Sequence, residues 1–76
     1  MKNAYEFDYS KLLGKIKEKK YTNERFAKAL GIGVDTFSGR INNKSEFKQC
    51  EMIKACILLD IPLSKLHLYF FCHGTL

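Results

Sequence analysis

The sequence predicts an all-α protein, a compact bundle of five short helices. Its 76 residues allow one domain at most. A chain this short buries only about 60% of the surface that its unfolded form exposes, which favours an economical helical bundle. Apolar residues recur with helical spacing, and no segment before Tyr69 requires a strand. We therefore expect residues 1–76 to form a single helical domain.

The first helix is expected from about Asp8 to Lys20. Apolar side chains recur at i, i+3, i+4 and i+7 between Tyr9 and Ile16, so they share one helical face. Asp8 is placed to cap the start of this helix. Lys19 and Lys20 suit the negative end of the helix dipole.

Two short helices joined by a tight turn are expected over about residues 22–43. Thr22 is placed to cap the first of them. Ala27 lies in its middle, where a small side chain lets another helix cross closely, and Gly31 suits a turn with positive φ. Phe37 then fills the angle between the two helices. This spacing predicts a helix-turn-helix, whose second helix can enter the DNA major groove.

A fourth helix is expected from a Ser45 cap to about Leu59, with Glu46 adding negative charge at its start. Its segment IKACILLD is apolar on more than one side. The expected inward face is Met52, Ile53, Cys56 and Leu59, or a close variant. Pro62 suits the first turn of a further helix, so LSKLHLYFF predicts a short fifth helix, alone or followed by an extended tail.

Basic residues are concentrated in the first part of the chain. The formal net charge is +5, and residues 1–45 carry ten Lys or Arg against five Asp or Glu. Residues 46–76 carry three of each. Clustered cations attract a polyanion and release its counterions on contact, which fits a nucleic-acid partner. A solvated lysine face is the alternative interpretation.

Several classes of protein are excluded by composition. There is no apolar run of about 18 residues for a membrane span, and the charged start MKNAYEFDYSK lacks the apolar core of a signal peptide. We therefore expect a cytoplasmic protein with no membrane partner. Its three widely spaced cysteines predict reduced thiols rather than a disulfide framework or a zinc site: Cys50, Cys56 and Cys72.

No pattern predicts catalysis. The sequence has no glycine-rich phosphate loop and no nucleophile motif. The neighbouring Cys72 and His73 are ligand-like, but no second pair of metal ligands lies near them in the sequence. We therefore expect no enzyme activity, no metal, no cofactor and no small-molecule ligand.

The stretch TNERFAKALGIGVDTFSGRINNK resembles the helix-turn-helix of phage-repressor and Cro-type proteins. Their common pattern reads roughly T-Q-E-E-L-A-K-x-L-G-I-S-x-x-T-[IV]-S-x-x-x-N-G-K, and residues 58–63 match the later L-G-[IV] turn. The resemblance covers about residues 8–68. It implies a lambda-repressor-like five-helix domain acting as a small phage or prophage transcriptional regulator. Such a protein binds operator duplex DNA with its third helix.

The resemblance also implies which residues contact DNA. Base-edge contacts would come from the third helix, at Val34, Asp35, Thr36, Ser38 and Gly39. Phosphate contacts would come from Asn23, Asn42, Asn43 and Lys44, and the cations Arg40 and Lys48 are added as candidates. Gly33, Val34 and Asp35 stand where this family often has Ser, Arg, Gln or Lys, so base preference is expected to be weak or unusual. Asn42 and Asn43 also suit a helix end, and Asp35 suits a helix dipole.

The end of the chain is too apolar for a free tail. A dimerisation tail over residues 64–76 is expected, with Leu66, Tyr69, Phe70 and Phe71 at the interface of a homodimer that matches two DNA half-sites. Part of this segment could instead close the core of one copy. The alternative function is a protein-interaction module of the same fold, an antitoxin or antirepressor, that binds another protein through this apolar surface.

Overall fold

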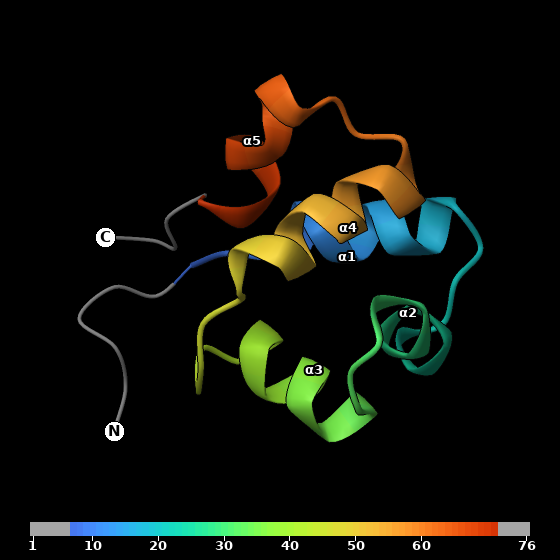
Figure 1. Ribbon diagram of the computed structural model, residues 1–76, viewed down its shortest axis with the longest axis vertical. Helices are drawn as coiled ribbons and strands as arrows, with labels where there is room; N and C mark the ends of the chain where they lie inside the picture. Colours follow the sequence, from blue (N-terminus) through green and yellow to red (C-terminus); the bar gives the residue numbers. More distant parts are fainter. Residues whose placement is uncertain (1–6, 72–76) are drawn as a thin grey trace.

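The computed structural model describes residues 7–71, and within them it is all-helical, as the sequence predicts. The helices are α1 (Ser10–Glu18), α2 (Asn23–Leu30), α3 (Val34–Ile41), α4 (Gln49–Leu59), the 3-10 helix η1 (Leu63–Lys65) and α5 (Leu66–Phe70). In Figure 1, α4 crosses the middle of the molecule, with α5 on one side and the α2–α3 pair on the other. None of the described helices is long and apolar enough to cross a membrane.

Helix α1 is shorter at both ends than the sequence suggests. It begins at Ser10, whose N–H donates to Asp8 Oδ1 at 2.9 Å, so Asp8 stabilises the start of the helix from outside it. It ends at Glu18, and Lys20 then takes a left-handed φ of 67°. This turn directs the chain into α2.

The α2–turn–α3 segment follows the predicted arrangement. Thr22 caps α2, because its Oγ1 accepts the Arg25 N–H at 3.1 Å. Gly31 ends α2 with a φ of 84°, a left-handed conformation that costs residues with a Cβ about 1–2 kcal/mol. Gly33 is the N-cap of α3. Phe37 is buried beneath this turn, so the angle between the two helices is filled as expected.

Helix α4 differs from the prediction in both its start and its buried face. It begins at Gln49, with Lys48 and not Ser45 as its N-cap, and Glu46 lies in the preceding loop. Ile53, expected to face inward, is 44% exposed. The buried residues of α4 are Glu51, Ala55, Cys56 and Leu59. Because the segment is apolar on more than one side, its periodicity could not select the face that packs.

The core contains a chain of aromatic rings that joins four parts of the fold. Phe47, in the loop before α4, contacts Tyr9 and Phe70 with ring centroids 5.2 and 5.1 Å apart. It also contacts Phe37 at 6.2 Å, and Phe37 contacts Phe26 of α2 at 5.8 Å. These edge-to-face contacts connect α1, α2, α3 and α5 through one loop residue. The sequence pattern did not single out Phe47, because it lies outside any helix.

The C-terminal part of the bundle closes this core. Asp60 ends α4 with a left-handed φ of 56°, and Pro62 is the N-cap of η1, which leads directly into α5. Phe70 is only 2% exposed and packs on Phe47. The assignment of Phe70 to a dimer interface is therefore wrong, because its ring is already used inside the monomer. Residues 72–76 of the expected dimerisation tail lie outside the described residues.

Candidate functional site

Four of the five predicted base-contacting residues lie on the exposed side of α3. Val34, Asp35, Thr36 and Ser38 are all exposed. Gly39 is half-buried under the following loop, where a Cβ added to it would lie 3.8 Å from Ser45 Oγ. The first two turns of α3 therefore present the surface that could meet a partner.

A hollow of about 340 Å³ lies beside this side of α3. Its apolar lining comes from Leu13, Val34, Phe37 and Ile41, and its polar lining from Asn23, Ser38 and Asn42. It therefore brings Asn23, a predicted phosphate contact, onto the same surface as the α3 residues. None of the lining side chains carries a charge.

The two asparagines after α3 are held by hydrogen bonds within the protein. Asn42 Nδ2 donates to the Ser38 backbone oxygen at 2.9 Å. Asn43 has a left-handed φ of 63°. The Phe7 N–H donates to Asn43 Oδ1 at 2.9 Å, and Asn43 Nδ2 donates to the Phe7 backbone oxygen at 3.0 Å. Both residues therefore end α3 and fasten its loop, which was the structural alternative for them. Their phosphate contacts stay a prediction.

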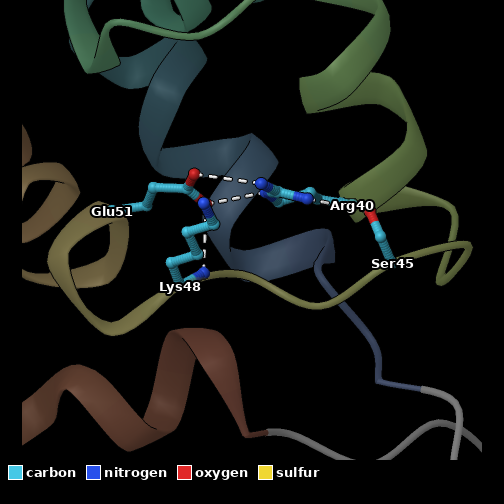
Figure 2. A network of polar contacts seen from close by, with 4 residues as sticks. All are labelled: Arg40, Ser45, Lys48 and Glu51. Atoms are coloured by element: carbon cyan, nitrogen blue, oxygen red, sulfur yellow. Dashed lines mark hydrogen bonds and ion pairs between the residues drawn. The ribbon is translucent and has the colours of Figure 1, made fainter.

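Arg40 does not face outward as a phosphate contact would. Its guanidinium is buried against Glu51 of α4, with Nε donating to Oε1 at 2.7 Å and Nη2 donating to Oε2 at 3.1 Å (Figure 2). Its Nη1 donates to Ser45 Oγ at 2.9 Å. The assignment of Arg40 to the phosphate-contacting set is therefore wrong. Because Arg40 is the one cation in the sequence of α3, the exposed side of that helix carries only the charge of Asp35.

Glu51 is the buried centre of this network and was not anticipated from the sequence. Its Oε1 also accepts the N–H of Lys48 at 3.0 Å, so one carboxylate joins α3 to the start of α4. Burial alone would raise the pKa of Glu51, but the hydrogen bonds from Arg40 and Lys48 outweigh it and lower the pKa. The bond to Glu51 raises the pKa of Arg40. Glu51 lies three residues after Lys48, a spacing that predicts a cap only when the helix start is known.

The remaining predicted cations are accessible. Lys44 lies exposed in the loop after α3, and Lys48 is exposed at the start of α4. With Asn23, they remain predicted phosphate contacts with exposed side chains, and the charge of Lys48 also helps to lower the pKa of Glu51.

Most of the large apolar side chains that are exposed within residues 7–71 belong to the segment from α4 onward. Six such residues are found in the described part of the chain: Val34 lies on α3, and the others are Ile53, Ile57, Leu63, Leu68 and Phe71. A groove of about 250 Å³, here called the α4–α5 groove, is lined by Gln49, Met52, Ile53, Leu66 and Phe71. Ile57 lies one turn beyond Ile53 on α4 and is 69% exposed.

This groove contains part of the predicted dimer interface. Leu66 and Phe71 line it, whereas Tyr69 is half-buried against the core. Ile53 and Ile57 were not recognised as surface residues, because the segment is apolar on more than one side and several faces of α4 could be buried. No signal in the sequence alone distinguishes these faces.

The structure offers no metal-binding group within residues 7–71. No cluster of three or more His, Cys, Asp or Glu side chains is found there. Cys50 is an exposed free thiol and Cys56 a buried one, and burial raises the pKa of the Cys56 thiol. The Cys72 and His73 pair lies outside the described residues.

Comparison with known proteins identifies the family. The chain belongs to the family described as "Protein of unknown function (DUF739)", which matches residues 5–73. It is similar to the solution structure of the modulator of repression (MOR) of the temperate bacteriophage TP901-1 from Lactococcus lactis, with 42% sequence identity and a TM-score of 0.73. That match covers 86% of this chain and 88% of the other. No curated protein matches the chain. These similarities indicate a phage regulatory protein.

Proposed function

We propose that this DUF739 protein modulates phage repression by binding another protein through the apolar surface of α4 and α5. The observation that carries the proposal is the exposure of five large apolar side chains on α4, η1, α5 and the residue after α5, two of which, Ile53 and Phe71, meet in the α4–α5 groove. Contiguous exposed apolar surface marks interaction sites. Because the related phage protein is named a modulator of repression, we propose the repressor of the same phage as the partner.

The α4–α5 groove has the chemistry of a protein contact. Four of its five lining residues are apolar, and the fifth, Gln49, is uncharged. Ile53 and Ile57 lie four residues apart on α4 and extend the apolar surface along the helix. An amphipathic partner helix can place apolar side chains into such a groove. Duplex DNA offers little to this surface, because phosphate needs cations.

The test is binding of the purified repressor of the same phage to two variants of the α4 surface, one in the groove and one a helical turn beyond it. Ile53→Lys and Ile57→Lys change exposed positions, so both variants are expected to fold, and each should weaken binding at least about tenfold. Val34→Lys is the matched control, because Val34 is 41% exposed and Ile53 is 44% exposed. The control should bind as the wild type does. Normal binding by both isoleucine variants, with loss in the Val34 variant, would instead place the contact on α3.

The second candidate function is duplex DNA binding by a helix-turn-helix made of α2 and α3. It is favoured by the exposed polar residues Asp35, Thr36 and Ser38 on α3, with Lys44 exposed in the loop that follows. The burial of Arg40 weakens this candidate, since it removes the cation of α3 from the surface. Asp35 can accept from a cytosine amino group but repels phosphate.

Salt dependence tests this second candidate. If phosphate contacts drive binding, the affinity for duplex DNA should fall with salt, with a log-log slope of about −0.9 per phosphate neutralised. Lys44→Ala should weaken binding to all sequences alike, whereas Asp35→Ala should change base preference or raise nonspecific affinity. Absence of duplex binding at low ionic strength would remove this candidate and leave the protein contact.

A further inference from the structure

One buried guanidinium connects three consecutive parts of the chain. Arg40 belongs to α3, its Nη1 holds Ser45 in the loop, and its Nε and Nη2 hold Glu51 in α4 (Figure 2). The side chains of Arg40 and Glu51 are 11% and 7% exposed. Both carboxylate oxygens are used, and Oε1 accepts a second bond from the Lys48 N–H. The position of α4 relative to α3 is therefore set by paired hydrogen bonds with fixed directions.

The network is connected to the α4–α5 groove through the first turns of α4. Glu51 lies between two groove residues in the sequence, Gln49 on one side and Met52 on the other, and Ile53 follows. A rotation of this part of α4 about its axis would move these three side chains together. The other wall of the groove comes from Leu66 and Phe71, which belong to a different part of the chain.

Besides the guanidinium, the segment that leads into α4 is held at Asn43, which bonds the Phe7 backbone, and at the ring of Phe47. In the loop of residues 42–48, all of which are described, Phe47 is the one side chain classed as buried. The Phe47 ring contacts Tyr9, Phe37 and Phe70 and so fixes where the loop lies, whereas the bidentate pair also fixes how the start of α4 is turned toward α3. Buried ion pairs often add no net stability compared with apolar side chains of similar size, so such a pair can be important mainly for geometry.

We propose that Arg40 and Glu51 are positioning residues that align the α4 wall of the α4–α5 groove for its partner, a role separate from fold stability. This inference rests on the proposed function of that groove. It assigns to Arg40 an indirect part in recognition, although Arg40 touches no partner. The Ser45 contact has the same role, because Ser45 Oγ accepts a hydrogen bond from Arg40 Nη1 and so fastens the loop before α4 to the guanidinium.

The main test uses the double variant Arg40→Met with Glu51→Gln. It removes both charges, and the glutamine keeps an acceptor for the Lys48 N–H. Its thermal midpoint should lie closer to the wild type than that of Arg40→Met alone, which leaves a buried carboxylate unpaired. Binding of the same purified repressor, measured at a temperature where circular dichroism shows the variant folded, should be about tenfold weaker. Hydrogen exchange of the Lys48 amide should be faster despite the retained acceptor, because the side chain at position 51 is no longer held by the guanidinium.

A matched control removes an exposed ion pair between two elements. Lys19 Nζ and Asp60 Oδ2 are 3.5 Å apart at the surface, after the ends of α1 and α4. The double variant Lys19→Met with Asp60→Asn should keep both its thermal midpoint and its repressor binding, because exposed pairs contribute little. This control separates a general effect of charge removal from the loss of alignment.

Each result decides between the two proposals. If the folded Arg40→Met and Glu51→Gln double variant binds like the wild type while Ile53→Lys does not, the positioning role is refuted and the groove remains the binding site. If Ile53→Lys binds like the wild type, the groove function itself fails. Should the double variant not fold, Ser45→Ala replaces it, since Ser45 is exposed. Unchanged loop exchange and unchanged binding in Ser45→Ala would then overturn the inference.

Discussion

Replacing Arg40 alone by Met should destabilise the protein strongly, because Glu51 would keep a buried charge without its partner. The removal of one member of a buried pair typically costs about 3–5 kcal/mol. This cost applies to buried pairs, and the side chains of Arg40 and Glu51 are only 11% and 7% exposed. Met restores the volume of the arginine stem, so the loss reports the stranded carboxylate and not a cavity.

The size of this loss is large for so small a domain. At about 0.05–0.15 kcal/mol per residue, 76 residues give a free energy of unfolding of about 4–11 kcal/mol. A loss of about 3–5 kcal/mol, at about 4–8 °C per kcal/mol, lowers the thermal midpoint by about 12–40 °C. The Arg40→Met variant should therefore be partly unfolded near 37 °C.

The loss should also depend on pH in a defined direction. In the wild type the pKa of Glu51 is lowered, so its contribution to stability is present above the ordinary carboxyl pKa and is lost as pH falls through the folded pKa. Without Arg40, burial remains and should raise the pKa of Glu51. The variant then regains stability as pH falls through the raised pKa. The difference in unfolding free energy between wild type and variant should be largest near neutral pH and shrink toward about pH 4.

Urea unfolding followed by circular dichroism at several pH values measures this difference. Equal slopes against urea in the two proteins would show that the same surface is exposed on unfolding. A loss of unfolding free energy below about 1 kcal/mol at pH 7 would refute the reasoning, because an exposed ion pair contributes that little to stability. A difference that does not change between pH 7 and pH 4 would show that Glu51 does not carry the effect.

Further predictions concern the core and two glycines. Phe70→Ala should cost about 3–5 kcal/mol by thermal melting, because its ring is 2% exposed and packs on Phe47 at the junction of the aromatic chain. Phe71→Ala, at a half-exposed site, should cost about 1 kcal/mol or less, and equal losses would argue against this core. Gly31→Ala should destabilise by about 1–2 kcal/mol because of its positive φ. Gly14→Ala should stabilise the protein by about 0.5–1 kcal/mol, since Gly14 lies within α1 and an added Cβ meets nothing within 4 Å. Urea titrations that show Gly31→Ala stabilising and Gly14→Ala destabilising would contradict the roles given to these two glycines.

Much of the fold could be predicted because the signals are local. The Thr22 cap acts on a backbone N–H three residues away, and Gly31 ends α2 through its own φ. The helical spacing from Tyr9 to Ile16 likewise concerns one segment, and its apolar face is buried. Such features are contained in short stretches of sequence, so the all-α class and the order of the helices were correctly predicted.

The candidate site was predicted less completely. The sequence placed Val34, Asp35, Thr36 and Ser38 on an exposed face, and they are exposed, but their base contacts stay a prediction. It placed Arg40 on the same surface, because a cation on a helix next to polar residues is usually solvated. Only the approach of Glu51, eleven residues later in the chain, makes burial of that cation favourable.

The sequence by itself determined the order of the helices, the Thr22 cap, the Gly31 turn and the excess of positive charge in the first part of the chain. The tertiary structure decided which face of α4 is buried, that Phe47 and Phe70 close the core, and that Ile53 and Ile57 remain at the surface. The physical reason is that these outcomes depend on contacts between segments distant in the sequence. A segment that is apolar on several sides offers several faces for packing, and the partner it meets selects among them.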